Sequence, residues 1–538
     1  MRHIKKLAGI ILALVLAISL TATAFAATVT ISADTIITGH KFTAYQIFSG
    51  REDNGVLSDI AWGDGISSAN FLAALKADTT YGNLFTACNN AADVANVLSD
   101  NNTNTALANQ VAKLAENNKT GAGVDLATGA NTMADGYYLI VDTTTDVGEG
   151  DAYNAALLQV VGNIDIAVKT DVPSVEKKVK EDDKYNQDGG YGAGYNDVAD
   201  YNIGEEVPFH LIGRVPDMSR YDTYKYIFHD TLSAGLTPPA ASGIKVYLSA
   251  DKICDDNDTD ITSNFSVDVT GQKITVSCDN IKVITGIAQG NYIIVEYSAV
   301  LNANAEIGLP GNLNTVKLEY SNKPDQSGSG DTDNTGETVE DKVIVFTYEL
   351  ETNKVDGQNP DTKLEGAKFV LLNADKSKVA TVDINGKLTG WVDLPAEGAD
   401  WAADSILTSD VNGLFTVAGL DDGTYYLREI EAPAGYNILT ADVEVIITAE
   451  TANGQDWTDG LAQNALTGLS ATADGEPGAR SRTVDIGYPS IIIANNSGST
   501  LPETGGIGTT IFYIAGAALV VAAIVLLVTK RRMGKAEK

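Results

Sequence analysis

Residues 423–436 read GTYYLREIEAPAGY. Within this stretch Tyr425, Leu427 and Glu429 alternate with their neighbours, and the side chains of a β-strand alternate between its two faces with period two. The pattern predicts a strand whose inward row starts with two large apolar side chains and continues with a carboxyl group. Glu429 is therefore a candidate for chemistry inside a core.

Two further strands of the same segment continue an apolar row into a reactive residue. The residues that share a face are Tyr348, Leu350, Thr352 and Lys354 on the first strand, and Ile491, Ile493 and Asn495 on the second. Burial disfavours the charged form of a lysine, which leaves a neutral, nucleophilic amine, and it keeps a carboxyl group protonated. Lys354, Glu429 and Asn495 are thus all expected to point into one sandwich.

The same segment also contains Leu364-Glu365-Gly366-Ala367-Lys368-Phe369. Through this stretch and the three strands above, residues 342–500 resemble the CnaB-type domain of Gram-positive surface proteins. The resemblance implies a spontaneous isopeptide bond between Lys354 and Asn495, with Glu429 as the proton shuttle and ammonia as the leaving group. The alternative is a buried salt bridge between Lys354 and Glu429, with Asn495 as a turn residue.

Residues 171–341 hold short strand candidates separated by turn signals and end in a linker, a pattern typical of an all-β sandwich. They resemble the CnaA-type D2 domain of fimbrial backbone subunits through the stretches VPSVEKKV (172–179), FHDTLSAGL (228–236) and GNLNTVKLEYSN (311–322). The resemblance implies a second bond between a lysine and Asn314, with Asp230 as the acid.

Strand parity places Asn314 on the face of Val316 and Leu318, and Asp230 on the face of Phe228. Lys177 shares a face with Val175 and Val179, which favours it as the amine of this bond. Lys178 is the alternative. A third possibility is that these lysines are solvated and no bond forms.

Residues 27–170 are predicted to form a β-sandwich with a helical insertion. Through Tyr45-Gln46-Ile47-Phe48 and Ile60-Ala61-Trp62-Gly63 they resemble the N-terminal domain of the same pilins. The resemblance implies a lysine at the end of this domain that resolves a sortase acyl-enzyme. Lys169 has that position, although the Tyr-Pro that often precedes it is absent. An ordinary surface lysine is the alternative, and Lys180 and Lys184 are weaker candidates.

Both ends of the chain carry targeting signals. Residues 1–26 combine a basic start, an apolar stretch and Ala24-Phe25-Ala26, and predict a secretory signal peptide. At the other end an apolar run from Ile511 to Val528 is near the length of a membrane-spanning helix, and basic residues follow it. The pentapeptide before this run is Leu501-Pro502-Glu503-Thr504-Gly505.

This C-terminal order of pentapeptide, span and basic tail resembles the cell wall sorting signal of Gram-positive surface proteins. The resemblance implies that a sortase cysteine attacks the carbonyl between Thr504 and Gly505, so that the chain is a substrate of covalent catalysis. A plain single-span anchor is the alternative.

The composition excludes some classes of partner. The net charge of −34 argues against nucleic acid. Three cysteines are too few for a disulfide framework, although Cys254 and Cys278 could pair within one domain, and Cys88 is expected to be buried. The four histidines are scattered, so no metal site is predicted, and no cofactor is expected.

The sequence as a whole predicts an all-β chain of tandem Ig-like sandwiches with a C-terminal transmembrane helix. Its expected divisions are 1–26, 27–170, 171–341, 342–500 and 501–538. We interpret it as a backbone pilin, a non-enzymatic shaft subunit in which Thr504 joins Lys169 of the next copy.

The expected partners are pilus-class and housekeeping sortases, identical subunits and peptidoglycan, with minor pilins and host surface ligands beyond them. The alternative function is a monomeric wall-anchored adhesin. A surface enzyme would need a convergent catalytic cluster, and none stands out in the sequence.

Overall fold

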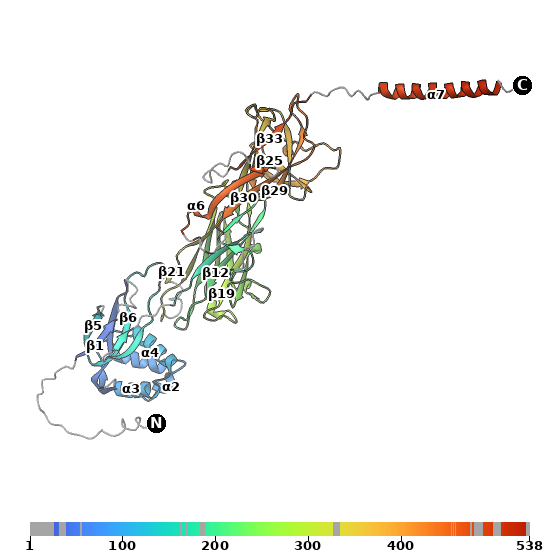
Figure 1. Ribbon diagram of the computed structural model, residues 1–538. Helices are drawn as coiled ribbons and strands as arrows, with labels where there is room; N and C mark the ends of the chain where they lie inside the picture. The colour runs from blue at the N-terminus through green and yellow to red at the C-terminus, as the bar shows by residue number, and fades with distance from the viewer. Residues whose placement is uncertain are drawn as a thin grey trace, which may run out of the picture.

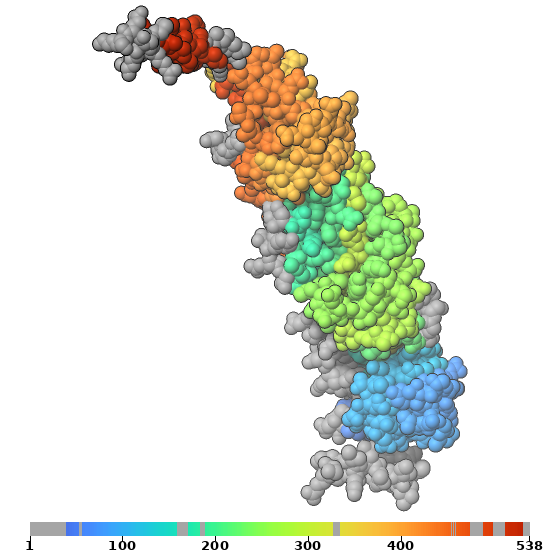
Figure 2. Space-filling view, turned by 90° about the vertical axis from the view of Figure 1, so that its right-hand side faces the viewer, coloured from blue at the N-terminus to red at the C-terminus, as the bar shows by residue number. Residues whose placement is uncertain are grey.

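The structure is a computed structural model in which three β-rich units follow one another in a row and a helix extends from the last (Figure 1). Figure 2 shows the same elongated outline from a second direction. The residues that the structure describes are 26–31, 39–53, 56–127, 129–161, 164–166, 171–182, 189–325, 334–452, 455, 457, 459–473, 476–477, 488–498 and 507–533. The predicted all-β class is confirmed. The predicted signal peptide lies outside the described residues, apart from Ala26.

The first unit contains two small sheets and a set of helices. One sheet has the order β5-β1-β8, and the other has the order β3-β2-β6-β7 with β4 on β2. Its strands are β1 (Ala26–Ile31), β2 (Phe42–Asp53), β3 (Val56–Trp62), β4 (Val124–Leu126), β5 (Gly129–Ala134), β6 (Gly136–Asp142), β7 (Leu157–Val161) and β8 (Ile164–Ile166). Its helices are α1 (Ser68–Ala77), α2 (Gly82–Phe85), α3 (Ala91–Asp100) and α4 (Thr105–Asn117).

The predicted helical insertion therefore lies between β3 and β4. Asn90 and Asn104 cap helices α3 and α4 by accepting the backbone N–H groups of Asp93 and Leu107. The helices bury an apolar stripe that includes Val94 and packs in one core with strands β2 and β6.

The second unit is a sandwich of two sheets. One has the order β10-β9-β12-β19-β15-β16 with β14 on β19, and the other has the order β11-β22-β20-β13-β18-β17 with β21 on β20. The first sheet contains β9 (Val175–Lys180), β10 (Tyr195–Asn196), β12 (Glu206–Arg214), β14 (Leu236–Thr237), β15 (Lys245–Ser249), β16 (Thr259–Asp260) and β19 (Tyr292–Leu301). The second contains β11 (Val198–Asp200), β13 (Tyr226–Leu232), β17 (Ser266–Thr270), β18 (Lys273–Cys278), β20 (Asn312–Ser321), β21 (Thr335–Glu337) and β22 (Asp341–Phe346).

The predicted boundary between residues 341 and 342 needs a correction. Strand β22 pairs with β20 and β11 inside the second sandwich, whereas the sequence interpretation assigned it to the third unit. The chain crosses between the sandwiches at Thr347, which is fully buried and donates its hydroxyl to the carbonyl of Leu420. Because apolar residues continue on both sides of Thr347 without a turn signal, the sequence showed one strand where the structure has two.

The third unit has a small sheet with the order β28-β23-β33 and a larger sheet with the order β26-β25-β24-β29-β30-β31-β32, with β27 on β24. The small sheet contains β23 (Tyr348–Asp356), β28 (Leu414–Leu420) and β33 (Ser490–Asn495). The larger sheet contains β24 (Lys368–Leu372), β25 (Lys378–Val382), β26 (Leu388–Asp393), β27 (Leu407–Thr408), β29 (Gly423–Glu431), β30 (Val443–Thr451), β31 (Leu466–Ala473) and β32 (Glu476–Pro477). A short helix, α6 (Ala462–Ala465), precedes β31.

Hydrogen bonds join successive units. At the first joint the guanidinium of Arg220 in the second unit donates to the carbonyl of Ala156 in the first unit at 2.9 Å, and Asp325 of the second unit holds this guanidinium at 2.5 and 2.7 Å. At the second joint the backbone N–H of Ile203 donates to the carbonyl of Gly419 at 2.9 Å. These contacts hold the units in line.

Helix α7 (Ile507–Met533) follows the third unit. Within the described residues, Phe512–Lys530 is long and apolar enough to cross a membrane. This agrees with the span predicted from Ile511 to Val528.

Candidate functional site

The third unit brings Lys354, Glu429 and Asn495 together from three strands. Strands β23 and β33 are adjacent and parallel, and they place Lys354 beside Ile493, two residues before Asn495. Glu429 comes from β29 in the facing sheet. Lys354 has no exposed surface, Asn495 is 1 % exposed and Glu429 is 6 % exposed. The parity prediction for these three strands is confirmed, because their inward rows are buried.

The asparagine side chain lies between the acid and a backbone turn. Asn495 Nδ2 donates to Glu429 Oε2 at 2.9 Å and to the carbonyl of Asn437 at 2.7 Å. The backbone N–H of Leu439 donates to the same carboxyl oxygen at 2.7 Å. Asn495 Oδ1 and Glu429 Oε1 are buried and have no hydrogen-bond partner among the described residues.

The amine of Lys354 is prepared for nucleophilic attack. Nζ donates to the carbonyl of Ile493 at 3.2 Å. Burial lowers the pKa of Lys354 to about 8, although the nearby Glu429 acts in the opposite direction. An amine with that pKa is neutral in about one molecule in ten at pH 7, which is about two hundred times the fraction expected for an exposed lysine.

The second unit brings Lys177, Asp230 and Asn314 together in the same way. Lys177 lies on β9, whereas Asp230 and Asn314 lie on β13 and β20 in the opposite sheet. Lys177 Nζ donates to Asp230 Oδ1 at 2.5 Å, and all three side chains are buried. Burial lowers the pKa of Lys177, although the ion pair with Asp230 opposes this shift.

Tyr297 is a member of this set that the sequence did not reveal. Its hydroxyl donates to Asp230 Oδ2 and accepts from Asn314 Nδ2 at 2.7 Å, so it bridges the acid and the amide. Burial and the carboxylate of Asp230 raise the pKa of Tyr297 well above its ordinary value, which keeps the phenol protonated. A tyrosine in a strand has the same sequence signal as an ordinary core residue, so only the fold identifies it.

Lys178, the alternative lysine, is also buried but faces the other side of β9. Its Nζ donates to Asp197 at 2.5 Å and lies 4.5 Å from the ring centroid of Tyr191. The amine of Lys178 therefore contacts Asp197 and Tyr191. Lys177 is the lysine that contacts Asp230, in the set that includes Asn314.

Both sets have the groups needed for amide exchange. A neutral lysine amine can attack the side-chain amide carbon of the asparagine, and the carboxyl group can carry protons between the amine and the leaving nitrogen. The atoms balance when the lysine N–H proton leaves with the amide NH₂ group as ammonia, which leaves a secondary amide between the two side chains.

The other predicted residues have different outcomes. Lys169 and the pentapeptide Leu501, Pro502, Glu503, Thr504 and Gly505 lie outside the described residues. The possible disulfide between Cys254 and Cys278 is wrong, because both cysteines are free. Cys278 lies inside the sandwich on β18, opposite Tyr226, whereas Cys254 lies near Glu296 on the outer face of the other sheet. Cys88 is buried, as predicted.

Three family models match the chain. Residues 203–324 match the model described as Gram-positive pilin backbone subunit 2, Cna-B-like domain, a name that differs from the CnaA type suggested by the motifs. Residues 348–460 match the SpaA prealbumin-like fold domain, and residues 494–533 match the LPXTG cell wall anchor motif. The chain thus has the domain set of a Gram-positive backbone pilin with an LPXTG anchor. It is a cell-wall-anchored surface protein.

The individual relatives have low sequence identity to the chain. The chain is 26 % identical over 284 residues to the trypsin-resistant surface T6 protein of Streptococcus pyogenes serotype M6, over 44 % of this chain and 48 % of that protein. It therefore spans about half the length of this curated relative.

Two solved structures are similar to the chain. The T6 backbone pilin of S. pyogenes has a TM-score of 0.49 at 17 % identity, covering 88 % of this chain and 98 % of that one. The full-length major pilin SpaD from Corynebacterium diphtheriae has a TM-score of 0.45 at 16 % identity, covering 88 % and 97 %.

Proposed function

We propose that this protein is the structural shaft subunit of a covalently polymerised surface pilus and is not an enzyme. The observation that carries the proposal is the occurrence of a buried lysine, carboxyl and asparagine set in each of two consecutive sandwiches. Each set connects a strand near the start of its unit with one near its end. Such cross-links suit a subunit that carries tension along its length.

In the proposed mature subunit, Lys177 is bonded to Asn314 and Lys354 is bonded to Asn495. Asp230 and Glu429 shuttle protons during bond formation. Both reactions occur within the folded chain and need no partner.

Polymerisation is proposed to use the sorting signal. A pilus-class sortase cleaves between Thr504 and Gly505, and the amine of Lys169 on the next subunit resolves the acyl-enzyme. Lys169 lies between β8 and β9 in the sequence, which is the junction of the first and second units. A housekeeping sortase then attaches the finished polymer to peptidoglycan.

The experiment that tests this function is a denaturing gel of cell wall extracts from cells that express the chain with its pilus sortase. We expect a ladder of high-mass species for the wild type, and loss of the ladder for Lys169→Ala and Thr504→Ala. Lys184→Ala is the matched control and should leave the ladder intact.

The outcomes discriminate between two functions. A ladder that persists in Lys169→Ala would assign the linkage to another lysine. A wild-type chain that is anchored to the wall but forms no ladder would support a monomeric adhesin and would refute the shaft.

A further inference from the structure

His210, Cys254 and Glu296 form a cluster on the second sandwich, outside the lysine site. One ligand atom from each residue lies within 4.8 Å of the others. His210 and Glu296 are directly opposite each other on the paired strands β12 and β19, and Cys254 lies in the loop between β15 and β16. Three separate segments of the chain therefore converge on one point.

The distances suit a single metal ion. His210 Nε2 lies 3.1 Å from Glu296 Oε2, close to the separation of about 3.4 Å between nitrogen and oxygen ligands of a tetrahedral zinc ion. The thiol of Cys254 donates to Glu296, so all three groups already share one small volume. Imidazole, thiolate and carboxylate are the three ligand types that Zn²⁺ takes in proteins.

The histidine ring is held in place before any ion arrives. The imidazole of His210 is stacked on the ring of Tyr195, with a centroid distance of 3.9 Å and an interplanar angle of 15°. His210 is 2 % exposed, while the side chain of Glu296 is 42 % exposed. The cluster is thus rigid at its base and open to solvent at the glutamate, where an ion could enter and a water molecule could complete the coordination.

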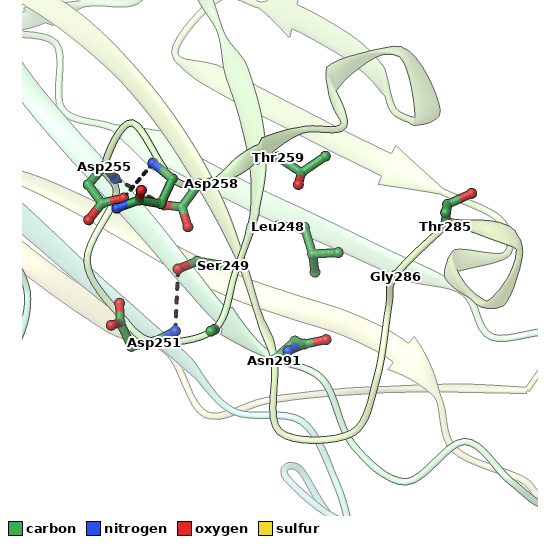
Figure 3. Close-up of a pocket in the computed structure, with 11 residues that line it drawn as sticks. Leu248, Ser249, Asp251, Asp255, Asp258, Thr259, Thr285, Gly286 and Asn291 are labelled. Carbon is green, nitrogen blue, oxygen red and sulfur yellow. Dashed lines mark hydrogen bonds between the residues drawn. The ribbon is translucent and has the colours of Figure 1, made fainter.

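The loop that carries Cys254 is also fixed by its own hydrogen bonds. Asp251 Oδ1 accepts the backbone N–H of Ile253, and Asp258 Oδ2 accepts that of Asp255. The same loop frames an adjacent hollow of about 370 Å³. Figure 3 shows Asp251 and Asp258 among the residues that line it. Cys254 is therefore presented to the sheet by a preorganised turn.

We propose that His210, Cys254 and Glu296 form a zinc site that fastens the loop between β15 and β16 to strands β12 and β19. Binding replaces the S–H bond of Cys254 with a sulfur–zinc bond and releases that proton to solvent. His210 binds through the Nε2 lone pair, and Glu296 binds as a carboxylate. The ion would cross-link the fold, because its three ligands come from three separate segments of the chain.

The test uses the full-length chain, reduced and purified in detergent, with Co²⁺ as a spectroscopic probe for Zn²⁺. We expect the near-ultraviolet charge-transfer absorption of a thiolate–cobalt bond, with one ion bound per chain. Addition of Zn²⁺ should abolish this absorption by displacement. Cys254→Ser should lose the band, and Glu296→Gln should weaken cobalt affinity at least about tenfold.

Cys88→Ser is the matched control, because Cys88 is a buried thiol in a different unit, and it should keep the band. Glu296 is partly exposed, so its variant keeps the test informative if the cysteine variant does not fold. A band that survives in Cys254→Ser, a band that Cys88→Ser removes, or equal affinity in wild type and Glu296→Gln would each overturn the proposal.

Discussion

Lys354 and Lys177 show how burial alone changes the chemistry of a side chain. An exposed lysine is a cation, but each of these amines lies in a core beside a carboxyl group and an asparagine amide. Desolvation lowers the pKa of both amines and so raises the fraction that can act as a nucleophile.

The bond at Lys354 should form faster as the pH rises toward 8. The neutral amine is the reactive form, and with a pKa of about 8 its fraction rises almost tenfold for each pH unit below that value. The full-length chain is kept unfolded in denaturant, so that no bond has yet formed. It is then diluted into buffers from about pH 5.5 to 9, and its mass is followed with time. A rate that is flat across this range would show that the neutral amine does not limit the reaction.

Tyr297→Phe should slow bond formation in the second unit without preventing folding. The change removes the hydroxyl that links Asp230 to Asn314 and keeps the aromatic ring that packs against Phe209. We expect a rate at least about tenfold lower, the effect of about 1.4 kcal/mol. The same time course by mass spectrometry measures it. Tyr292→Phe, also on β19, is the control, and equal slowing in both variants would contradict a specific role for Tyr297.

At the scale of strands, period-two alternation predicted the site well. It placed Lys354, Glu429 and Asn495 on inward rows, and the structure buries all three. It favoured Lys177 and left Lys178 as the alternative, because strand parity does not show that partners from distant segments bury both lysines. Tyr297 was missed for a similar reason, since its role depends on which strand faces β19. Cys254 and Cys278 were close in sequence, yet Cys278 lies on β18 of one sheet and Cys254 lies in a loop beside the other sheet.

Glu429→Ala should remove one cross-link and lower the stability of the third unit. The bond from Lys354 to Asn495 closes a loop of about 140 residues, and a cross-link of that length contributes about 5 kcal/mol in the chain-entropy account of disulfides. Intact mass should show one ammonia fewer lost than in the wild type, together with a lower melting temperature. Exposed Glu431→Ala is the control. If Glu429→Ala has the same mass deficit relative to its own sequence as the wild type, the acid is not the shuttle.

The joint between the second and third units holds carboxyl groups that repel one another. Asp421 is 7 % exposed, and burial followed by the charge of Asp200 raises its pKa well above the ordinary value. The folded chain therefore keeps this proton at a pH where the unfolded chain has released it. The contribution of Asp421 to the free energy of unfolding is fully present below about pH 4. It is lost as the pH rises toward the raised pKa.

Asp421→Asn should consequently stabilise the chain at pH 7 and have little effect near pH 4. The amide keeps Oδ1, which accepts the backbone N–H of Asp422, and it removes the charge. Thermal melts of wild type and variant across this pH range measure the difference, with exposed Asp400→Asn as the control. A variant that melts below the wild type at pH 7 would contradict the assignment.

At the scale of the whole molecule, the three units differ in how they resist unfolding. Within the described part of the first unit no lysine is buried, whereas the second and third units each bury a lysine next to an acid and an asparagine. The first unit should therefore unfold at the lowest temperature. Limited proteolysis during heating should cleave residues 27–170 first and leave a resistant fragment of the other two units. Cleavage of the second unit before the first would contradict this order.

The most direct test of the covalent account is the intact mass of the full-length chain. Two isopeptide bonds release two molecules of ammonia, so the measured mass should fall below the mass calculated from the sequence by about 34 Da. Lys354→Ala and Lys177→Ala should each restore about half of that deficit. A wild-type mass equal to the sequence value would contradict both bonds and the covalently locked shaft with them.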